Sequence, residues 1–555
     1  MAKEKTNSVY VATYPIKFNK PDMDMMNRLM RQCVLLQNTL NNKMFNVYNY
    51  VTSSKEYRKI ESDYAICNGD DKSLITDDNI IVNIVNEYKG KIDKKKAYVL
   101  ARERFFKSYE TDYKGERGNI LKLKPFTEYG IIAYSAKYKK QYPLLNAKTA
   151  EYVGKSVYMQ WSKMIENPET EIKFKSSRFI DKASVSFSKS GGKLIGITLS
   201  NDMRHINVKV GKHIVNGEII IRNSEYNTYV IDAFNKGNVK IVKFVKSQVR
   251  GKDYYEVQFS IDGVPYNKMR NIGTGKVGID LGVSTVAAYG TGELEMLTLN
   301  TETTDMYLEK KAKIQLAMDQ SRRATNPDNY NEDGTIKKLP DGQKLRWKCS
   351  KHYLDLKKQN AELERLRAYH RKQHHNSIAN RLIEMGDTFI IEDNNIKAMA
   401  KRAKETTVNE KTGKINSKKR MGKSIGNNAP SQLVSILENK VKALGGTFKK
   451  VSCKGASTQF DFTDQSFTKR EGKERNVVLS NGNTHTRDGI AAFNIKHRID
   501  PGKKNIKVTD NYDIDAMTKD YESFVVAEQN EIARHISGEK NTAWAMGIKK
   551  MLLKS

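Results

Sequence analysis

The stretch that decides the fold is KVGIDLGVSTVAAYG, residues 276–290. It opens with an apolar run, carries a single acid, Asp280, and continues through Gly282 into small and apolar residues. This pattern is typical of a strand that turns tightly into a second strand. Asp280 would then lie where one carboxylate can face a charged ligand.

Two classes of enzyme use a segment of this kind. Actin-like ATPases and sugar kinases place it against nucleotide phosphates, whereas RNase H-like nucleases use its carboxylate to hold a catalytic metal ion. Net charge favours the second class, because 97 Lys and Arg against 64 Asp and Glu give +33 over 555 residues. A field of that size attracts polyanions, so we expect a long phosphate backbone as the partner.

Cysteine usage indicates a reducing compartment. The four cysteines include no close pair, so neither a disulfide framework nor a CxxC metal site can be drawn. The first residues, MAKEKTNS, are charged, and no uncharged apolar run approaches the roughly 18 residues of a membrane span. We therefore expect a cytoplasmic chain without a membrane partner.

The first half of the chain changes its periodicity twice. Residues 9–18 alternate apolar and polar like an opening strand, and the residues after them follow helical spacing, with an apolar stripe of Met26, Leu29, Met30, Cys33 and Leu36. Alternation returns in KASVSFSK, LIGITLS and DYYEVQFSID, and the expected turns are Gly191–Gly192, Asn216–Gly217 and Lys236–Gly237. We predict a small β-barrel from residues 1–19 and 172–268, with an α-helical domain, residues 20–171, inserted into it.

Tyrosines recur every four residues inside this helical domain. Tyr134, Tyr138 and Tyr142 alternate with lysines such as Lys137, so one helix face could offer rings and cations to stacked bases and phosphates. A partly buried helix face produces the same spacing and is the favoured interpretation.

Three histidines lie in a basic helical segment predicted over about 304–386. His370 and His374 are four residues apart, as in some metal sites, and His375 follows. No acid or cysteine accompanies them in the pattern that a metal site needs, so we expect these rings to be solvated or to face phosphate.

Two further acids stand at the ends of predicted elements. In DTFIIEDNNIKAM a short buried strand ends in Glu392, and in THTRDGIAAFNIKHR Asp488 stands at the start of a helix. Each acid alone is equally compatible with a turn aspartate, a strand-end glutamate or a helix cap. Together with Asp280 they form an oxygen-ligand set that suits Mg²⁺. Two such ions, roughly 4 Å apart, can activate water and stabilise the leaving oxygen in phosphodiester hydrolysis.

The three segments GIDLGV, IIEDNNIKAM and RDGIAAFNI resemble the RuvC motifs of the TnpB transposon nucleases and of the compact type V CRISPR effectors related to them. The match places an RNase H-like (RuvC) nuclease domain with helical insertions at residues 269–500 of an α/β multidomain chain. The preceding barrel and helical insert are similar to the wedge and recognition domains of these families. No second glycine-rich phosphate segment supports the ATPase alternative.

The resemblance implies an RNA-guided, Mg²⁺-dependent DNA endonuclease with one RuvC site, which cuts after guide RNA pairs with the target strand. Its metal ligands would be Asp280, Glu392 and Asp488, holding two Mg²⁺ ions for which Mn²⁺ can substitute. The implied partners are guide RNA, either CRISPR RNA or RNA from a mobile element, and target DNA. One chain or a homodimer could hold the RNA.

One departure from these families concerns zinc. They usually carry a four-cysteine zinc ribbon between the second and third motifs, but here that interval offers only Cys453. With His485 it cannot complete a tetrahedral site, so we expect no structural zinc. Residues 450–486 instead resemble a zinc-free segment that loads the target strand. The residues there that could guide DNA are Phe460, Phe462, Arg470 and Lys473.

The remaining predictions concern the neighbours of these motifs. Arg487 is expected either to hold the scissile phosphate or to form a salt bridge at the helix start. Residues 401–423 are basic and carry Gly and Ser, so they would form a mobile loop that either closes over the site or stays on the surface. We assign no role to the tail, residues 501–555. A transposon-encoded TnpB-type nuclease and a guided DNA-binding protein with weak or no cleavage remain as alternatives.

Overall fold

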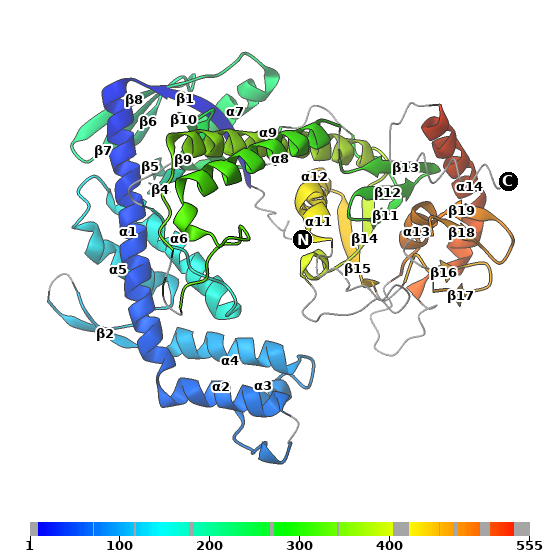
Figure 1. Ribbon diagram of the computed structural model, residues 1–555, viewed down its shortest axis with the longest axis horizontal. Helices are drawn as coiled ribbons and strands as arrows, with labels where there is room; N and C mark the ends of the chain where they lie inside the picture. Colours follow the sequence, from blue (N-terminus) through cyan, green and yellow to red (C-terminus); the bar gives the residue numbers. More distant parts are fainter. Residues whose placement is uncertain are drawn as a thin grey trace. The chain divides into compact units, whose positions relative to one another are not determined.

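The computed structural model divides the chain into two compact units, Met1–Tyr266 and Asn267–Ser555 (Figure 1). The structure describes residues 9–69, 72–115, 118–176, 182–263, 265–266, 271–300, 302–340, 343, 345–402, 421–453, 456–469, 474–499 and 511–537. In the described part of the chain, no helix is both long and apolar enough to cross a membrane.

The first unit contains an eight-stranded antiparallel sheet in the order β5-β4-β9-β10-β1-β8-β7-β6. Its strands are β1 Val9–Phe18, β4 Ala183–Ser190, β5 Lys193–Leu194, β6 Ile197–Leu199, β7 His205–Val210, β8 His213–Ile219, β9 Val239–Val249 and β10 Lys252–Asp262. The predicted opening strand is therefore confirmed. Among the described residues the end strands β5 and β6 do not pair, so the result is a near-barrel sheet that is open at one side.

Strand β1 lies inside the sheet and pairs with a different strand along each part of its length. Its residues from Val9 to Pro15 pair with β10, and those from Ile16 to Phe18 pair with β8. Every second side chain from Tyr10 to Ile16 is buried, as the alternation in the sequence requires.

A set of helices and one hairpin lies between β1 and β4 in the sequence. Its elements are α1 Lys20–Thr52, α2 Lys55–Asn68, η1 Lys72–Leu74, α3 Ile80–Glu87, α4 Lys94–Ser108, β2 Thr111–Lys114, β3 Ile120–Leu123, α5 Glu128–Lys139 and α6 Ala147–Glu166. Asn19 caps α1 by accepting a 2.8 Å hydrogen bond from the Asp22 amide. The predicted apolar stripe of α1 is confirmed, because all five of its residues are buried.

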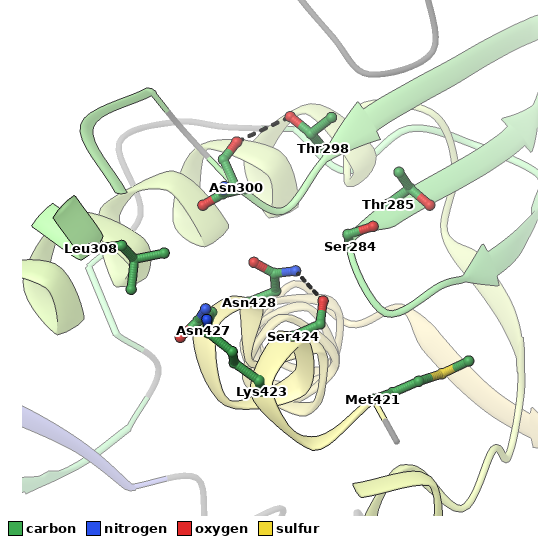
Figure 2. A pocket seen from close by; sticks show the side chains of 10 residues that line it. All are labelled: Ser284, Thr285, Thr298, Asn300, Leu308, Met421, Lys423, Ser424, Asn427 and Asn428. Carbon is green, nitrogen blue, oxygen red and sulfur yellow. Dashed lines mark hydrogen bonds between the residues drawn. The ribbon is translucent and has the colours of Figure 1, made fainter. Parts of the chain in front are cut away.

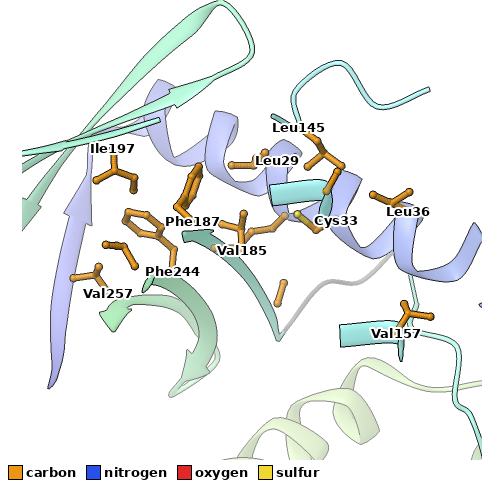
Figure 3. Packing of buried hydrophobic residues seen from close by; sticks show 14 of the residues in the cluster. Leu29, Cys33, Leu36, Leu145, Val157, Val185, Phe187, Ile197, Phe244 and Val257 are labelled. Atoms are coloured by element: carbon orange, nitrogen blue, oxygen red, sulfur yellow. The ribbon is translucent and has the colours of Figure 1, made fainter. Parts of the chain in front are cut away.

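The stripe of α1 packs against the sheet to form the core of the first unit. Figure 3 shows Leu29 and Cys33 of α1 beside Val185 and Phe187 of β4, with Phe244 of β9 next to Phe187. Burial of such side chains contributes roughly 1.5–3 kcal/mol each, which fixes the helices on the sheet.

Two features of this region differ from the sequence-based prediction. Residues Glu225–Asn235 form a helix, α7, whose start is capped by the Ser224 side chain, where only strands and turns were expected. Asn216–Gly217 is not a turn but lies inside β8. A Cβ on Gly217 would lie 2.6 Å from Ile16 Cδ1, so this glycine makes room for side chains of β1.

The second unit is built on a five-stranded mixed sheet in the order β13-β12-β11-β14-β15. The first three strands in sequence are antiparallel, while β14 runs parallel to β11 and β15 parallel to β14. The strands are β11 Lys276–Leu281, β12 Thr285–Gly290, β13 Glu293–Thr298, β14 Thr388–Glu392 and β15 Thr447–Val451. The quoted stretch thus forms the expected strand, tight turn and second strand.

Helices cover both faces of this sheet. Helices α9 and α12 pack on one face, and α13 and α14 pack on the other (Figure 1). The helices are α8 Glu302–Thr325, η2 Pro327–Asn329, α9 Lys351–Leu382, α10 Ile396–Ala400, α11 Gly422–Asn428, α12 Pro430–Ala443, α13 Arg487–Lys496 and α14 Ile514–Ile536. Two small hairpins precede α13, namely β16 Phe460–Asp461 with β17 Ser466–Phe467, and β18 Asn476–Val478 with β19 Thr484–Thr486.

Candidate active site

Two of the three predicted acids stand at neighbouring strand ends. Strands β11 and β14 are parallel, with Ile279 opposite Ile391, and the next residue in each strand is an acid, Asp280 and Glu392. The two isoleucines are buried in the core that α9 and α12 cover. Because side chains alternate along a strand, the two carboxylates point to the opposite face, on which α13 lies.

The third acid is brought to this face by a glycine. A Cβ on Gly278 would lie only 2.1 Å from the Ala492 carbonyl oxygen and 2.2 Å from the Lys496 amide nitrogen. The backbone of α13 therefore rests directly on β11, two residues before Asp280. The first turn of α13 carries Asp488, which is buried. The three acids from distant parts of the sequence thus converge on one face of the sheet.

Each acid has a different local environment. Glu392 Oε1 accepts a 2.5 Å hydrogen bond from Ser457 Oγ, and the Ser457 amide lies 3.4 Å away. Asp488 Oδ1 accepts a 3.0 Å hydrogen bond from Arg487 Nε, and Arg475 lies 3.9 Å from the other oxygen. The half-buried Asp280 carboxylate makes no side-chain hydrogen bond to any described residue.

The electrostatics of the site are dominated by crowded negative charge. Burial raises the pKa of Asp280 well above its usual value, and the nearby carboxylates of Asp488 and then Glu392 raise it further. The guanidinium of Arg487 lowers this pKa and offsets part of the effect. A divalent cation would relieve the same repulsion, and carboxylate oxygens are of the kind that Mg²⁺ prefers as ligands.

The carboxylates of Asp280, Glu392 and Asp488 do not form a metal-ligand group in this structure. In the described part of the chain, no three His, Cys, Asp or Glu side chains are grouped so that they could hold a metal ion. Ser457 contacts Glu392 at Oε1 and Arg487 contacts Asp488 at Oδ1, so each acid would offer its other carboxylate oxygen to a cation. Arg487 forms the salt bridge at the helix start, and its Nη1 also donates to the Glu474 carbonyl at 3.1 Å.

Ser457, which the sequence analysis did not identify, holds Glu392 through a hydrogen bond. Ser457 is buried, its carbonyl accepts a 2.8 Å hydrogen bond from Asn494 of α13, and its hydroxyl lies 3.3 Å from the Tyr512 hydroxyl. An amide such as Asn494 inside the apolar run IAAFNI was the signal that could have indicated a buried polar contact. Ser457 itself lies in a loop without periodicity and gave no signal.

Of the residues predicted to guide DNA in the loading segment, the two phenylalanines are buried and the two basic residues are not described. Phe460 is buried and stacks on Tyr512 with ring centroids 4.0 Å apart, and Phe462 is buried against Phe493 and Tyr521. The expectation that these two rings guide DNA is wrong, because both belong to the core. Arg470, Lys473 and residues 403–420 of the basic loop lie outside the described residues.

The tyrosine stripe of the first unit is a packed helix face. Tyr134 is buried, with its ring edge-on to Tyr113 at 5.6 Å, so no base can stack on it. Tyr138 is half-buried and lies 6.5 Å from Tyr134. Lys137 is exposed, but its ammonium lies over the Tyr113 ring at 5.3 Å. The favoured interpretation of this spacing therefore agrees with the structure.

The three histidines of α9 are not a solvated group. His375 is fully buried, His374 Nε2 lies 2.8 Å from the Thr298 carbonyl, and His370 stacks on Tyr307. The pKa of His375 is lowered to about 4, mainly by burial and to a smaller extent by the neighbouring His374 and Arg371. The expectation of solvated or phosphate-facing rings was wrong for His375, because this part of α9 packs on α12.

A cavity of about 500 Å³ adjoins the turn that follows Asp280. Hydroxyls and amides line it, and Figure 2 shows Asn428 donating a 3.2 Å hydrogen bond to Ser424. Asn428 also donates to the Val283 carbonyl at 3.2 Å, which ties α11 to the β11–β12 turn. Helix α11, which follows the basic loop, is therefore bonded to the turn that comes directly after Asp280.

Solved structures similar to the chain include a chain of a Cas12f1–sgRNA–target DNA complex, with 13% identity and a TM-score of 0.46, covering 90% of this chain and 100% of that one. A chain of a CRISPR-Cas12f ternary complex has 15% identity and a TM-score of 0.24, over 88% and 83%. A chain of a Cas12i1 R-loop complex after target DNA cleavage has 10% identity and a TM-score of 0.28, over 93% and 65%. No protein-family model and no curated protein matches the sequence. Similarity at this level transfers no function to the chain.

Proposed function

We propose that the chain is an RNA-guided DNA endonuclease of the type V CRISPR kind, with a RuvC-like nuclease domain in its second unit. One observation carries the proposal. Asp280, Glu392 and Asp488 come from the three RuvC-like motifs and converge on one face of a mixed sheet. Burial, and then the crowding of the other two carboxylates, raises the pKa of Asp280, as expected for carboxylates arranged to receive a cation.

The three carboxylates would hold Mg²⁺, or Mn²⁺ in its place, and no zinc is needed. When bound, the metal supplies charge stabilisation at the phosphate and activates the attacking water. The chain's own residues prepare the site for this role. Asp280 must release its proton before it can act as a ligand, Ser457 orients Glu392, and Arg487 lies beside Asp488 where a phosphate would approach.

Guidance by RNA is proposed from the sequence. The net charge of +33 fits an RNA and a DNA strand together, and the motifs resemble those of guided nucleases. Sequencing the RNA that copurifies with the protein, expressed with its native flanking DNA, tests this. A constant scaffold with variable ends from a repeat array supports a CRISPR effector, and a single end matching adjacent DNA supports a TnpB-type nuclease. Recovery of no discrete RNA would contradict guidance.

Cleavage is tested separately with Mg²⁺ against EDTA. The purified complex is expected to cut a matched DNA target in Mg²⁺, and Asp280→Ala is expected to bind the same target without cutting it. One alternative, a guided DNA-binding protein with little cleavage, is favoured by the finding that no three His, Cys, Asp or Glu side chains of the described residues are grouped to hold a metal ion. Target binding by the parent without cleavage in either Mg²⁺ or Mn²⁺ would support that alternative.

A further inference from the structure

The start of α13 is held by the C-terminal helix α14. Glu528 of α14 is buried, and its Oε1 accepts hydrogen bonds from the Thr486 amide at 2.7 Å and from the Thr486 hydroxyl at 2.5 Å. Its Oε2 lies 2.6 Å from His485 Nδ1. Three donors from the two residues that precede α13 therefore converge on one carboxylate.

This contact replaces the usual cap of the helix. Thr486 is the N-cap residue of α13, yet its side chain makes no capping hydrogen bond, because its hydroxyl donates to Glu528 instead. A Cβ on Gly489 would lie 2.4 Å from the Thr486 hydroxyl and 3.1 Å from Glu528 Oε1. The glycine after Asp488 is thus required for the close approach of this carboxylate.

The carboxylate is itself held in one orientation. His485 Nε2 lies 2.7 Å from the Tyr521 hydroxyl, so the ring bridges Glu528 and Tyr521. Phe524, one turn before Glu528, packs edge-on against Tyr289 with centroids 5.2 Å apart. A negative charge at a helix N-terminus is also favourable to the helix dipole.

We infer that Glu528 is a positioning residue that fixes Asp488 for metal binding, an inference that rests on the proposed function. Asp488 lies two residues after Thr486. The hydrogen bonds from Thr486 to Glu528 therefore fix the position of the Asp488 carboxylate relative to Asp280 and Glu392. This gives the tail, to which the sequence assigned no role, a part in the site. Partners of this kind typically change metal affinity or activity by about 10- to 100-fold.

The same helix provides a matched control at the other end of α13. Asp520 of α14 accepts hydrogen bonds from Lys496 at 2.6 Å and from the Tyr289 hydroxyl at 3.0 Å, and His497 lies 2.9 Å away. Like Glu528 it is an acid that docks α14 on α13, but it contacts the C-terminal end, where Lys496 lies eight residues, or about 12 Å, from Asp488 along the helix. Its loss should weaken docking without moving Asp488.

The experiment compares the parent protein with Glu528→Ala, Glu528→Gln and Asp520→Asn. Free Mn²⁺ is measured by electron paramagnetic resonance in titrations of each purified protein, alongside its thermal unfolding and the Mg²⁺ dependence of DNA cleavage. We expect Glu528→Ala to raise the Mn²⁺ Kd and the half-saturating Mg²⁺ concentration by about tenfold. Glu528→Gln should show a smaller shift, because its amide oxygen can still accept from Thr486. Asp520→Asn should lower the unfolding midpoint without shifting the Mn²⁺ Kd.

Each result bears on the inference. An unchanged Mn²⁺ Kd in a folded Glu528 variant would overturn it, as would an equal shift in Asp520→Asn, which would indicate a general effect of docking. If Glu528→Ala does not fold, Glu528→Gln decides. A parent protein that neither binds Mn²⁺ nor cleaves DNA overturns the proposed function and this inference with it, whereas an active parent with insensitive Glu528 variants overturns the inference alone.

Discussion

Substitution of Gly278 by alanine tests whether α13 sets the geometry of the site. The new Cβ would lie 2.1 Å from the Ala492 carbonyl oxygen, whereas ordinary contacts begin at 3.4 Å. The helix must therefore move by about 1.3 Å. Its backbone cannot rotate out of the way as a side chain could, so we expect a cost near the upper end of overpacking, about 3 kcal/mol of unfolding free energy.

The effect on cleavage should be larger than the effect on binding. A displacement of about 1 Å at reacting groups can reduce a rate by about 100-fold. We expect Gly278→Ala to bind guide RNA and target DNA as the parent does, and to cleave at about one hundredth of the parent's rate. Cleavage is measured under single-turnover conditions, with denaturant unfolding of the same samples.

A second glycine serves as the control for this substitution. Gly426 lies in α11, and a Cβ there would meet no atom within 4 Å. Gly426→Ala should therefore leave cleavage unchanged and slightly stabilise the protein, since alanine favours the helix. If Gly278→Ala has the same unfolding free energy and cleavage rate as Gly426→Ala, then α13 does not rest on β11 and this contact does not position Asp488.

Three further predictions concern the same unit. Separate alanine substitutions of Asp280, Glu392 and Asp488 should each abolish cleavage while target binding persists in a mobility-shift assay; cleavage by any of these variants at the parent's rate would remove that residue from the site. Ser457→Ala should lower the cleavage rate by about tenfold through loss of the hydrogen bond to Glu392, with little change in target affinity, and a pure loss of affinity would contradict this role. The folded-state pKa of His375 is about 4, below its unfolded value near 6.5, so the unfolded chain binds more protons between these values and unfolding free energy should fall as pH drops from about 6.5 to about 4. His375→Asn should reduce that slope in urea titrations at several pH values, and an unchanged slope would show that another group is responsible.

The elements that the sequence predicted well are those with strict periodicity or with a charge at the end of an apolar run. Alternation alone identified β1, and the stripe from Met26 to Leu36 identified the buried face of α1. Asp280 and Glu392 follow apolar strand residues, so their position at strand ends could be derived without coordinates. Asp488 lies on the same face as the other two acids because Gly278 lets α13 pack closely on β11. The sequence does not reveal this role of Gly278, since it depends on the position of α13 on the sheet.

Other predictions failed where tertiary contacts override local pattern. Phe460 and Phe462 look exposed in a polar segment, yet aromatic residues from α13 and from the region preceding α14 enclose them. His375 lies in a highly basic helix, but the packing of α12 on α9 removes it from water. The role of Glu528 had no sequence signal, because the residues it holds precede it by some forty positions and form no recognisable pattern with it.

The pairing of β1 has a consequence for the order in which the protein can fold during synthesis. Val9 is made before every helix from α1 to α7, but its partner, Asp262, is made only after them. Until then β1 would have exposed edges that can pair with other chains. The helices between β1 and β4 can pack earlier, because their contacts are closer in sequence. Closure of the sheet is therefore the last step in building the first unit, and a nascent chain halted before β10 should require a chaperone to shield its N-terminal strand.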